Sequence, residues 1–226
     1  MTSATLAILT IGVVSLQEIM PLLTEHVSEE QITYVNLLGK MTREEAIAEY
    51  ASHHGEEQIT VRLNDDLPLD VSKPRIERDI QAIINVLDGE GFDVILLMTP
   101  TPLDGMKAKK SILLEPQRIL SPLVRSIVEG HRMGVIVPGP EMLTTQRNRW
   151  LELQNPPSFA LANPLLSTDA ELITAARQLL ADGADVVMLD SPGFHLHHSE
   201  LLQKVLDVPV VLSSVLLARL TIELLS

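Results

Sequence analysis

The sequence predicts an α/β fold of two pseudo-symmetric halves, each with a parallel sheet. The first observation is an internal repeat: segments 91–100 and 183–192 both begin with Gly-x-Asp, continue as an apolar run and end in a hydroxyl residue followed by proline. The second is the alternation of short apolar runs with amphipathic segments, which is typical of βαβ units. The third is composition, because hydrophobic residues make up 46% of the chain and aromatic residues only 3%. Buried parallel strands are built from such aliphatic residues.

In the first half, short apolar runs closed by turn residues predict strands, and segments with helical spacing follow them. The predicted strands are 5–12, 32–38, 58–63 and the run from Asp93, and 111–114 is a brief apolar segment. The predicted helices are 15–26, a segment from Thr42, and 74–88. Ser15 with Glu18, and Thr42 with Glu45, have the spacing of a capping box, which marks where these two helices begin.

The second half repeats this alternation. Strands are predicted at 133–138, near Phe159, from Asp185, and at 209–212. Helices are predicted at 116–130, 141–153, 168–181, from about 195, and from the last strand to 225. The boundary between the halves is expected near 111–116, and the last helix is expected to return to the first half. The predicted domains are therefore 1–112 with 213–226, and 113–212.

Charge and composition exclude several classes of protein. The net charge is −13, with 30 acidic and 17 basic residues, so a nucleic-acid partner is not expected. The chain contains no cysteine, which removes disulfides, thiolate catalysis and cysteine-bound metals. No apolar run is long enough to span a membrane, and the apolar N-terminal stretch lacks the flanks of a signal peptide. We expect a soluble cytoplasmic protein with no membrane partner.

The repeat also indicates where a ligand would bind. Ligands of parallel α/β sheets bind at the carboxyl ends of strands, and Thr99 and Ser191 occupy equivalent positions there. Either these hydroxyl residues contact a ligand, or they cap the segments that follow. Asp190 ends a predicted buried strand, where it either orients a ligand, acts as a base or caps the next helix. Gly12, Pro138 and Gly139 also follow predicted strands, where they shape the floor of a cleft or form ordinary turns.

Two further clusters are interpreted as solvated. His195, His197 and His198 would need a third ligand on one face to hold a metal, so a solvated helix start is favoured and no metal site is predicted. Lys107, Lys109 and Lys110 form the clearest basic cluster, which is interpreted as a solvated loop.

Several segments together resemble the AroM family. They are Ala7–Gly12, Leu37–Glu45, Asp93–Thr99, Val135–Pro138 and Gly183–Asp190. The AroM family is similar to the aspartate/glutamate/hydantoin racemase superfamily. This resemblance implies two flavodoxin-like lobes with an active site in the inter-lobe cleft. It also implies that Thr99 and Ser191 stand where the racemases carry their two acid/base cysteines.

This chain departs from the racemase pattern at both positions. An unactivated hydroxyl has a far higher pKa than a thiol, so two-base racemisation does not transfer to Thr99 and Ser191. Proline follows each of them and has no N–H to offer a substrate carboxylate. Thr101 and Gly193 keep their N–H groups and are predicted ligand contacts.

The sequence therefore predicts an AroM-like protein that binds a small carboxylated metabolite in the inter-lobe cleft. Whether it also transforms this metabolite is left open, but two-cysteine racemisation is excluded. The alternative is a non-catalytic metabolite-binding or regulatory protein descended from a racemase-like fold. Whether the protein is an enzyme stays open, and no cofactor is expected. The family name suggests a link to aromatic amino-acid metabolism, and a homo-oligomer is conceivable.

Overall fold

The computed structural model describes residues 4–14, 16–17, 19–65, 67–99, 101–191 and 193–225. The chain forms two compact units. The first unit comprises Met1–Val14, Leu23–Ile119 and Leu220–Ser226, and the second comprises Ser15–Leu22 and Leu120–Arg219. The domain limits expected from the sequence, at 112 and 212, stay a prediction.

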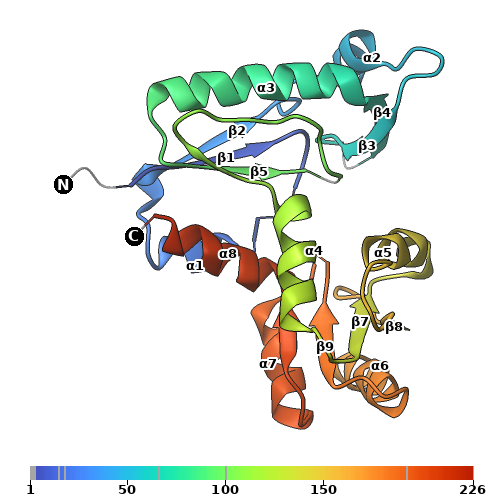
Figure 1. Ribbon diagram of the computed structural model, residues 1–226. Coiled ribbons are helices and arrows are strands. Elements are labelled where there is room, and N and C mark those ends of the chain that lie inside the picture. The colour runs from blue at the N-terminus through green and yellow to red at the C-terminus, as the bar shows by residue number, and fades with distance from the viewer. Residues whose placement is uncertain are drawn as a thin grey trace. The chain divides into compact units, whose positions relative to one another are not determined.

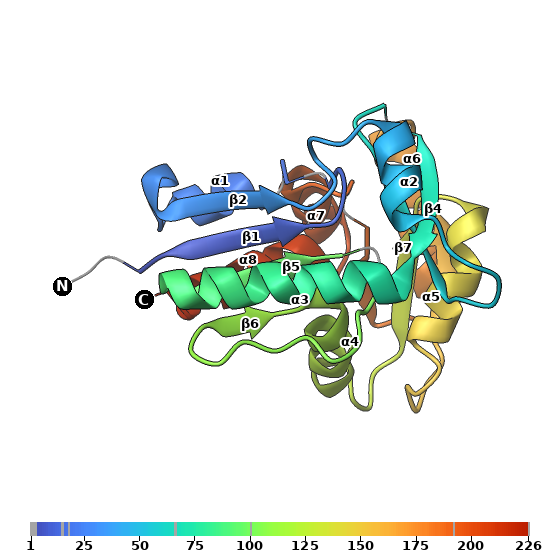
Figure 2. The same ribbon diagram turned by 90° about the horizontal axis from the view of Figure 1, so that it is seen from above.

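The first unit contains a parallel sheet with the order β2-β1-β5-β6. Its strands are β1 (Leu6–Thr10), β2 (Ile32–Asn36), β5 (Val94–Met98) and β6 (Ile112–Leu114). All of β1 is buried. The long helix α3 (Lys73–Glu90) runs along this sheet (Figure 2) and packs Ile76, Ile80 and Ile84 into the core of the unit.

The second unit repeats this topology. Its strands are β7 (Met133–Val137), β8 (Ser158–Leu161), β9 (Val186–Leu189) and β10 (Val210–Leu212). All three pairings are parallel, and the order β8-β7-β9-β10 matches β2-β1-β5-β6. Helix α6 (Asp169–Ala181) packs against β7 and β8 (Figure 1). The α/β class and the parallel sheets predicted from the sequence are confirmed.

The two repeated Gly-x-Asp segments have the same structural role in their units: the glycine ends a helix and the aspartate binds the backbone before a neighbouring strand. Gly91 and Gly183 follow α3 and α6 with φ of 91° and 94°, a left-handed conformation that favours glycine. The Asp93 carboxylate accepts a hydrogen bond from Thr5 N at 2.8 Å, just before β1. The Asp185 carboxylate accepts one from Arg132 N at 2.8 Å, just before β7. Both aspartates therefore tie neighbouring strands together at the amino-terminal edge of their sheet.

The remaining helices follow the predicted order with some changes of length. They are α1 (Met20–Thr24), α2 (Arg43–Tyr50), α4 (Pro116–Ile127), α5 (Leu143–Arg149), α7 (Leu196–Val205) and α8 (Ser213–Glu223), with short 3₁₀ turns η1 (Glu29–Gln31) and η2 (Pro140–Met142). The predicted helix 15–26 is wrong in its first part, because α1 begins only at Met20. A proline in a helix interior removes a hydrogen bond, whereas Pro21 fits in the first turn of the shorter helix. The proposed capping residues Ser15 and Glu18 lie outside the described residues.

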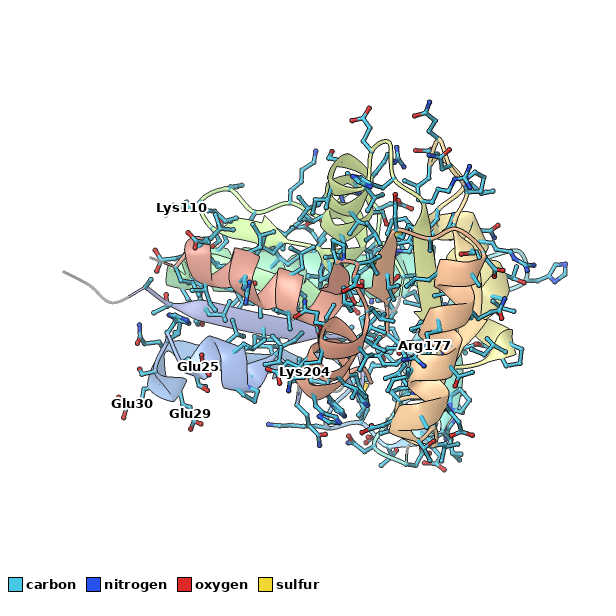
Figure 3. All side chains as sticks on the ribbon, turned by 90° about the horizontal axis from the view of Figure 1, so that it is seen from below. Glu25, Glu29, Glu30, Lys110, Arg177 and Lys204 are labelled. Atoms are coloured by element: carbon cyan, nitrogen blue, oxygen red, sulfur yellow. The ribbon has the colours of Figure 1, made fainter. Side chains whose placement is uncertain are left out.

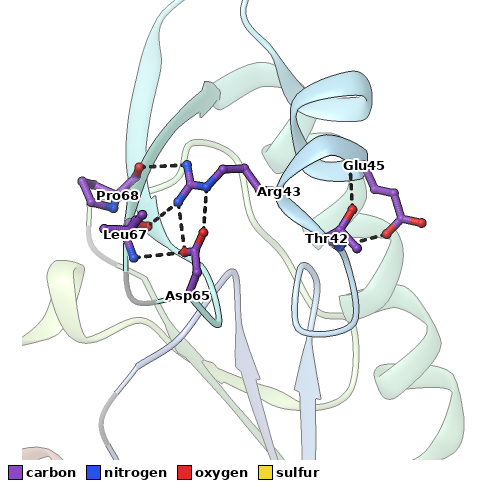
Figure 4. A network of polar contacts seen from close by, with 6 residues as sticks. All are labelled: Thr42, Arg43, Glu45, Asp65, Leu67 and Pro68. Atoms are coloured by element: carbon purple, nitrogen blue, oxygen red, sulfur yellow. Dashed lines mark hydrogen bonds and ion pairs between the residues drawn. The ribbon is translucent and has the colours of Figure 1, made fainter.

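An antiparallel hairpin in the first unit was only half predicted. Strand β3 (Gln58–Arg62) was expected, and it pairs with β4 (Pro68–Ser72), which was not. Arg43 at the start of α2 holds the loop between these strands, because its guanidinium binds the Asp65 carboxylate at 2.7 Å and the carbonyls of Leu67 and Pro68 (Figure 4). The predicted capping box of Thr42 and Glu45 is present.

Several charged side chains extend from the surface (Figure 3). Glu25, Glu29 and Glu30 extend outward from the segment between α1 and β2 (Figure 3). Across the part of the chain that the structure describes, no helix combines the length and the apolar character needed to cross a membrane.

Candidate functional site at the carboxyl ends of the strands

Three neighbouring strands of the second unit end at one edge of its sheet. The register pairs Ile136 of β7 with Leu189 of β9, and Leu189 with Leu212 of β10. The residues that follow these strands therefore come together. They are Pro138 and Gly139 after β7, Asp190 and Ser191 after β9, and Ser213 and Ser214 after β10. We call them the strand-end group.

Asp190 is held from one face of helix α5. Its side chain is only 4% exposed, and its Oδ2 lies 2.9 Å from Nη1 of Arg149, whose side chain is 17% exposed. Gln146 Nε2 donates to the Asp190 carbonyl at 3.3 Å. One turn of α5 thus holds both the backbone and the side chain of Asp190, since residues 146 and 149 share a helix face.

Trp150 completes this contact. Its Nε1 donates to Gln146 Oε1 at 3.0 Å, and both side chains are buried. The Arg149 guanidinium lies over the Trp150 ring, 5.2 Å from its centroid, and its Nε donates to Ser121 Oγ at 3.0 Å. Trp150 is the only tryptophan of the chain, so its fluorescence reports on this edge of the sheet.

Ser191 is buried, with 8% of its surface exposed. Its carbonyl accepts from Phe194 N at 3.1 Å, and its Oγ accepts a long bond from Gly193 N at 3.5 Å. Gly193 packs so closely on Pro164 that a Cβ at this position would lie 2.8 Å from Pro164 Cγ. The turn after β9 is therefore compact and fixed, and Ser191 serves it partly as a turn residue. Pro192 lies outside the described residues.

Polar atoms without hydrogen-bond partners collect at this edge. Among the residues that the structure describes, five buried side-chain N and O atoms have no hydrogen-bond partner. Three of them are Arg149 Nη2, Asp190 Oδ2 and Ser214 Oγ, and the other two belong to Ser72 and Ser111 of the first unit. Buried groups of this kind usually bind water, an ion or a ligand. Ser213 Oγ, by contrast, donates to the Leu189 carbonyl at 3.3 Å.

The first unit places the other predicted site residues at the equivalent edge. Thr99 follows β5, and its Oγ1 donates to the Thr101 carbonyl at 2.7 Å. Gln117 Nε2 approaches the Thr99 carbonyl at 3.4 Å. Gly12 follows β1, where a Cβ would lie 2.2 Å from the Arg62 carbonyl oxygen. Gly12 is thus required by the packing of β1 against β3, and Pro100 lies outside the described residues.

The structure therefore brings the predicted site residues together in two groups, one in each unit. Sequence reasoning missed Gln146, Arg149 and Trp150, through which helix α5 contacts the second group. Their i, i+3, i+4 spacing was visible, but spacing alone does not say which strand end a helix face contacts.

The solvated interpretation of the histidines is wrong for His198. His198 is buried, its Nδ1 accepts from His195 N at 2.9 Å, and Phe194 packs edge-on at 5.7 Å between ring centroids. Burial lowers the pKa of His198, and the neighbouring His195 and His197 lower it further. His198 thus serves as the N3 residue of the capping box that begins α7, with His195 as the N-cap. Within the described ranges, no three His, Asp or Glu side chains cluster closely enough to hold a metal ion.

The lysine cluster is organised by its backbone. The Asp88 carboxylate accepts hydrogen bonds from the N–H groups of Ser111 at 2.7 Å, Lys110 at 2.8 Å and Lys109 at 3.2 Å. These bonds, first those of Ser111 and Lys110, lower the pKa of Asp88 to about 2. Lys107, Lys109 and Lys110 themselves are exposed, as a solvated loop requires.

Two hollows of the second unit lie away from the predicted site. A cavity of about 230 Å³ is lined by residues that include Arg125, His131, Glu152 and Asn155, and a more open hollow of about 420 Å³ lies between β8 and α6. Neither lining includes a predicted site residue.

Comparison with known proteins identifies the family. The sequence matches the AroM protein family over residues 6–225. The chain belongs to the AroM family. The sequence matches no curated protein.

Several solved structures share the fold of this AroM protein. Unliganded arylmalonate decarboxylase is 11% identical with a TM-score of 0.57, and the match covers 99% of this chain and 93% of that one. The maleate isomerase Iso from Pseudomonas putida S16 is 12% identical with a TM-score of 0.56, covering 98% and 92%. Glutamate racemase from Francisella tularensis, in complex with D-glutamate, is 13% identical with a TM-score of 0.51, covering 100% and 82%. The racemase-like fold expected from the sequence is confirmed.

Proposed function

We propose that this AroM protein binds a small carboxylated metabolite through the residues at the carboxyl ends of its strands. The residues concerned are Ser191, Asp190 and Gly193 at the strand ends of the second unit, and Thr99 and Thr101 at the strand ends of the first unit. The observation that carries the proposal is the collection of buried polar atoms without hydrogen-bond partners in the strand-end group and the arginine beside it. A folded protein leaves few such atoms without a partner.

The names of the structural neighbours support a carboxylate as the ligand. Glutamate racemase was solved with D-glutamate, and the decarboxylase and isomerase are named for arylmalonate and maleate. Each of these compounds carries two carboxyl groups. A net charge of −13 disfavours anions at long range, so a local cation such as Arg149 is needed.

Proton transfer between two thiols has no counterpart in this chain. Thr99 and Ser191 carry hydroxyls, which are not ionised near neutral pH because their pKa is high. An un-ionised hydroxyl is too weak a base to remove a carbon-bound proton unaided. Asp190 is the stronger candidate base, and its Oδ2 lies 2.9 Å from Nη1 of Arg149. If turnover occurs, we expect Asp190 to take part. The rival function is binding without turnover, in a regulatory or carrier protein, and it is favoured by the two hydroxyl replacements.

A binding screen tests the proposal. Small carboxylic acids are titrated into the wild-type protein while Trp150 fluorescence is followed, and positive acids are confirmed by calorimetry. We expect Ser191→Ala and Thr99→Ala each to weaken binding about 10-fold, as for a lost hydrogen bond to a charged group. The control is Thr174→Ala, on the exposed surface of α6. Unchanged affinity in both site variants would remove these residues from the site.

Turnover is measured on every acid that binds, by NMR of the acid over time. Loss of turnover in Asp190→Asn or His195→Ala, with binding retained, supports an enzyme. Binding without any chemical change supports the rival. A cytoplasmic location, a homo-oligomer and the link to aromatic amino-acid metabolism stay predictions.

A further inference from the structure

Two atoms with unmet hydrogen-bonding capacity lie side by side in the second unit, one a donor and the other an acceptor. Arg149 Nη2 is buried and has no hydrogen-bond partner. Asp190 Oδ2 is buried and contacts Arg149 Nη1 at 2.9 Å as an ion pair, without the alignment of a hydrogen bond. The pair thus neutralises its charges but leaves directional bonding incomplete.

The guanidinium is held in place by three different contacts. Its Nε is taken by Ser121, its Nη1 faces Asp190, and its plane lies over Trp150. Arginine presents its N–H groups in a rigid fork that matches a carboxylate. Nη2 is a buried guanidinium nitrogen without a hydrogen bond, so a carboxylate that reaches it would not compete with Ser121 for a donor.

Resting on the function proposed above, we propose that Arg149 and Asp190 form the recognition element for the ligand. The ligand's carboxylate accepts from Arg149 Nη2, and a hydrogen-bond donor on the adjacent carbon of the same ligand binds Asp190 Oδ2. The ligand class is therefore a carboxylic acid with a hydroxyl or ammonium group next to its carboxylate. Such a molecule satisfies both unmet atoms. Where the donor is an ammonium group, its charge also offsets that of the adjacent carboxylate.

The test uses acids in matched triplets that differ only at the adjacent carbon. One triplet is propionate, lactate and alanine, and another is succinate, malate and aspartate. Each acid is titrated into the full-length protein with Trp150 fluorescence as the readout, because Arg149 lies over that ring. In the wild type, we expect the best donor-bearing member of a triplet to bind about 10-fold or more tightly than the plain acid.

Two variants separate the roles of the pair. Arg149→Lys keeps the charge opposite Asp190 but loses the fork, so every member of the triplet should bind about 10- to 100-fold more weakly. Asp190→Asn should instead remove the preference for the donor-bearing member. Arg147→Lys is the matched control, because Arg147 lies in the same helix with its guanidinium 6.0 Å from the Phe159 ring centroid. Circular dichroism confirms that each variant is folded.

The outcomes distinguish this inference from the function on which it rests. Equal affinity across the triplets, or an Arg149→Lys variant that binds like the wild type, overturns the recognition element while carboxylate binding stands. Binding of none of the acids at 10 mM overturns both. If a variant is unfolded, the double variant Arg149→Met/Asp190→Asn removes both charges together, and it must lose binding for the inference to hold.

Discussion

Replacing Gly12 by alanine tests the structural role of a residue that the sequence assigned to the ligand site. The new Cβ would lie 2.2 Å from the Arg62 carbonyl oxygen, which is a backbone atom and cannot rotate away. Ordinary contact would require the end of β1 and strand β3 to separate by about 1 Å. That movement strains or breaks the hydrogen bond from Val13 N to Arg62 O, now 2.8 Å long. The lost bond and the overpacking together should cost about 2–4 kcal/mol.

Urea unfolding followed by circular dichroism measures this cost. With the urea dependence expected for a chain of this size, the midpoint of Gly12→Ala should fall by about 1 M or more. Gly89→Ala is the control, because a Cβ at this position in helix α3 meets no heavy atom within 4 Å. It should stabilise the protein by about 0.5–1 kcal/mol. A Gly12→Ala midpoint equal to that of the wild type would refute the packing argument.

Three further predictions concern charged and titratable groups. The pKa of Asp88 is lowered to about 2, so its stabilising effect is present above the pKa of the unfolded chain, near 4, and is lost as pH falls toward 2. Urea midpoints measured from pH 5 to pH 2 should therefore fall more steeply in the wild type than in Asp88→Asn. The lowered pKa of His198 means that the folded state binds fewer protons than the unfolded state. Stability should thus decline as pH drops below about 6.5, less so in His198→Gln. Lys73→Met removes the partner of Asp104, 2.7 Å away, and should speed amide hydrogen exchange in residues 101–110 while Lys107→Met does not.

The repeat carried most of the fold prediction. The strand pattern, the glycines at 91 and 183 and the paired aspartates all follow from reading the two segments side by side. The predicted capping box at Thr42 gave the start of α2 to the residue, because capping depends on neighbours in sequence. Helix α1 shows the limit of periodicity, since an apolar spacing that suited a helix from residue 15 ignored Pro21.

What the sequence could not supply are contacts made by distant segments. Strand β4 begins with proline and alternates weakly, so its identity depends on pairing with β3. The strand ends of the site were predictable because parallel sheets place them at one edge. The contacts of Arg149 and Gln146 with Asp190 were not predictable, because they depend on how α5 packs beside the end of β9.

A crystal structure of the protein with its tightest-binding acid would show where the ligand binds. We expect the acid's carboxylate within hydrogen-bonding distance of Arg149 Nη2, beside Asp190 and Ser191. An acid bound instead in the cavity near His131, or anywhere without contact to the strand ends of the second unit, would contradict the proposed site.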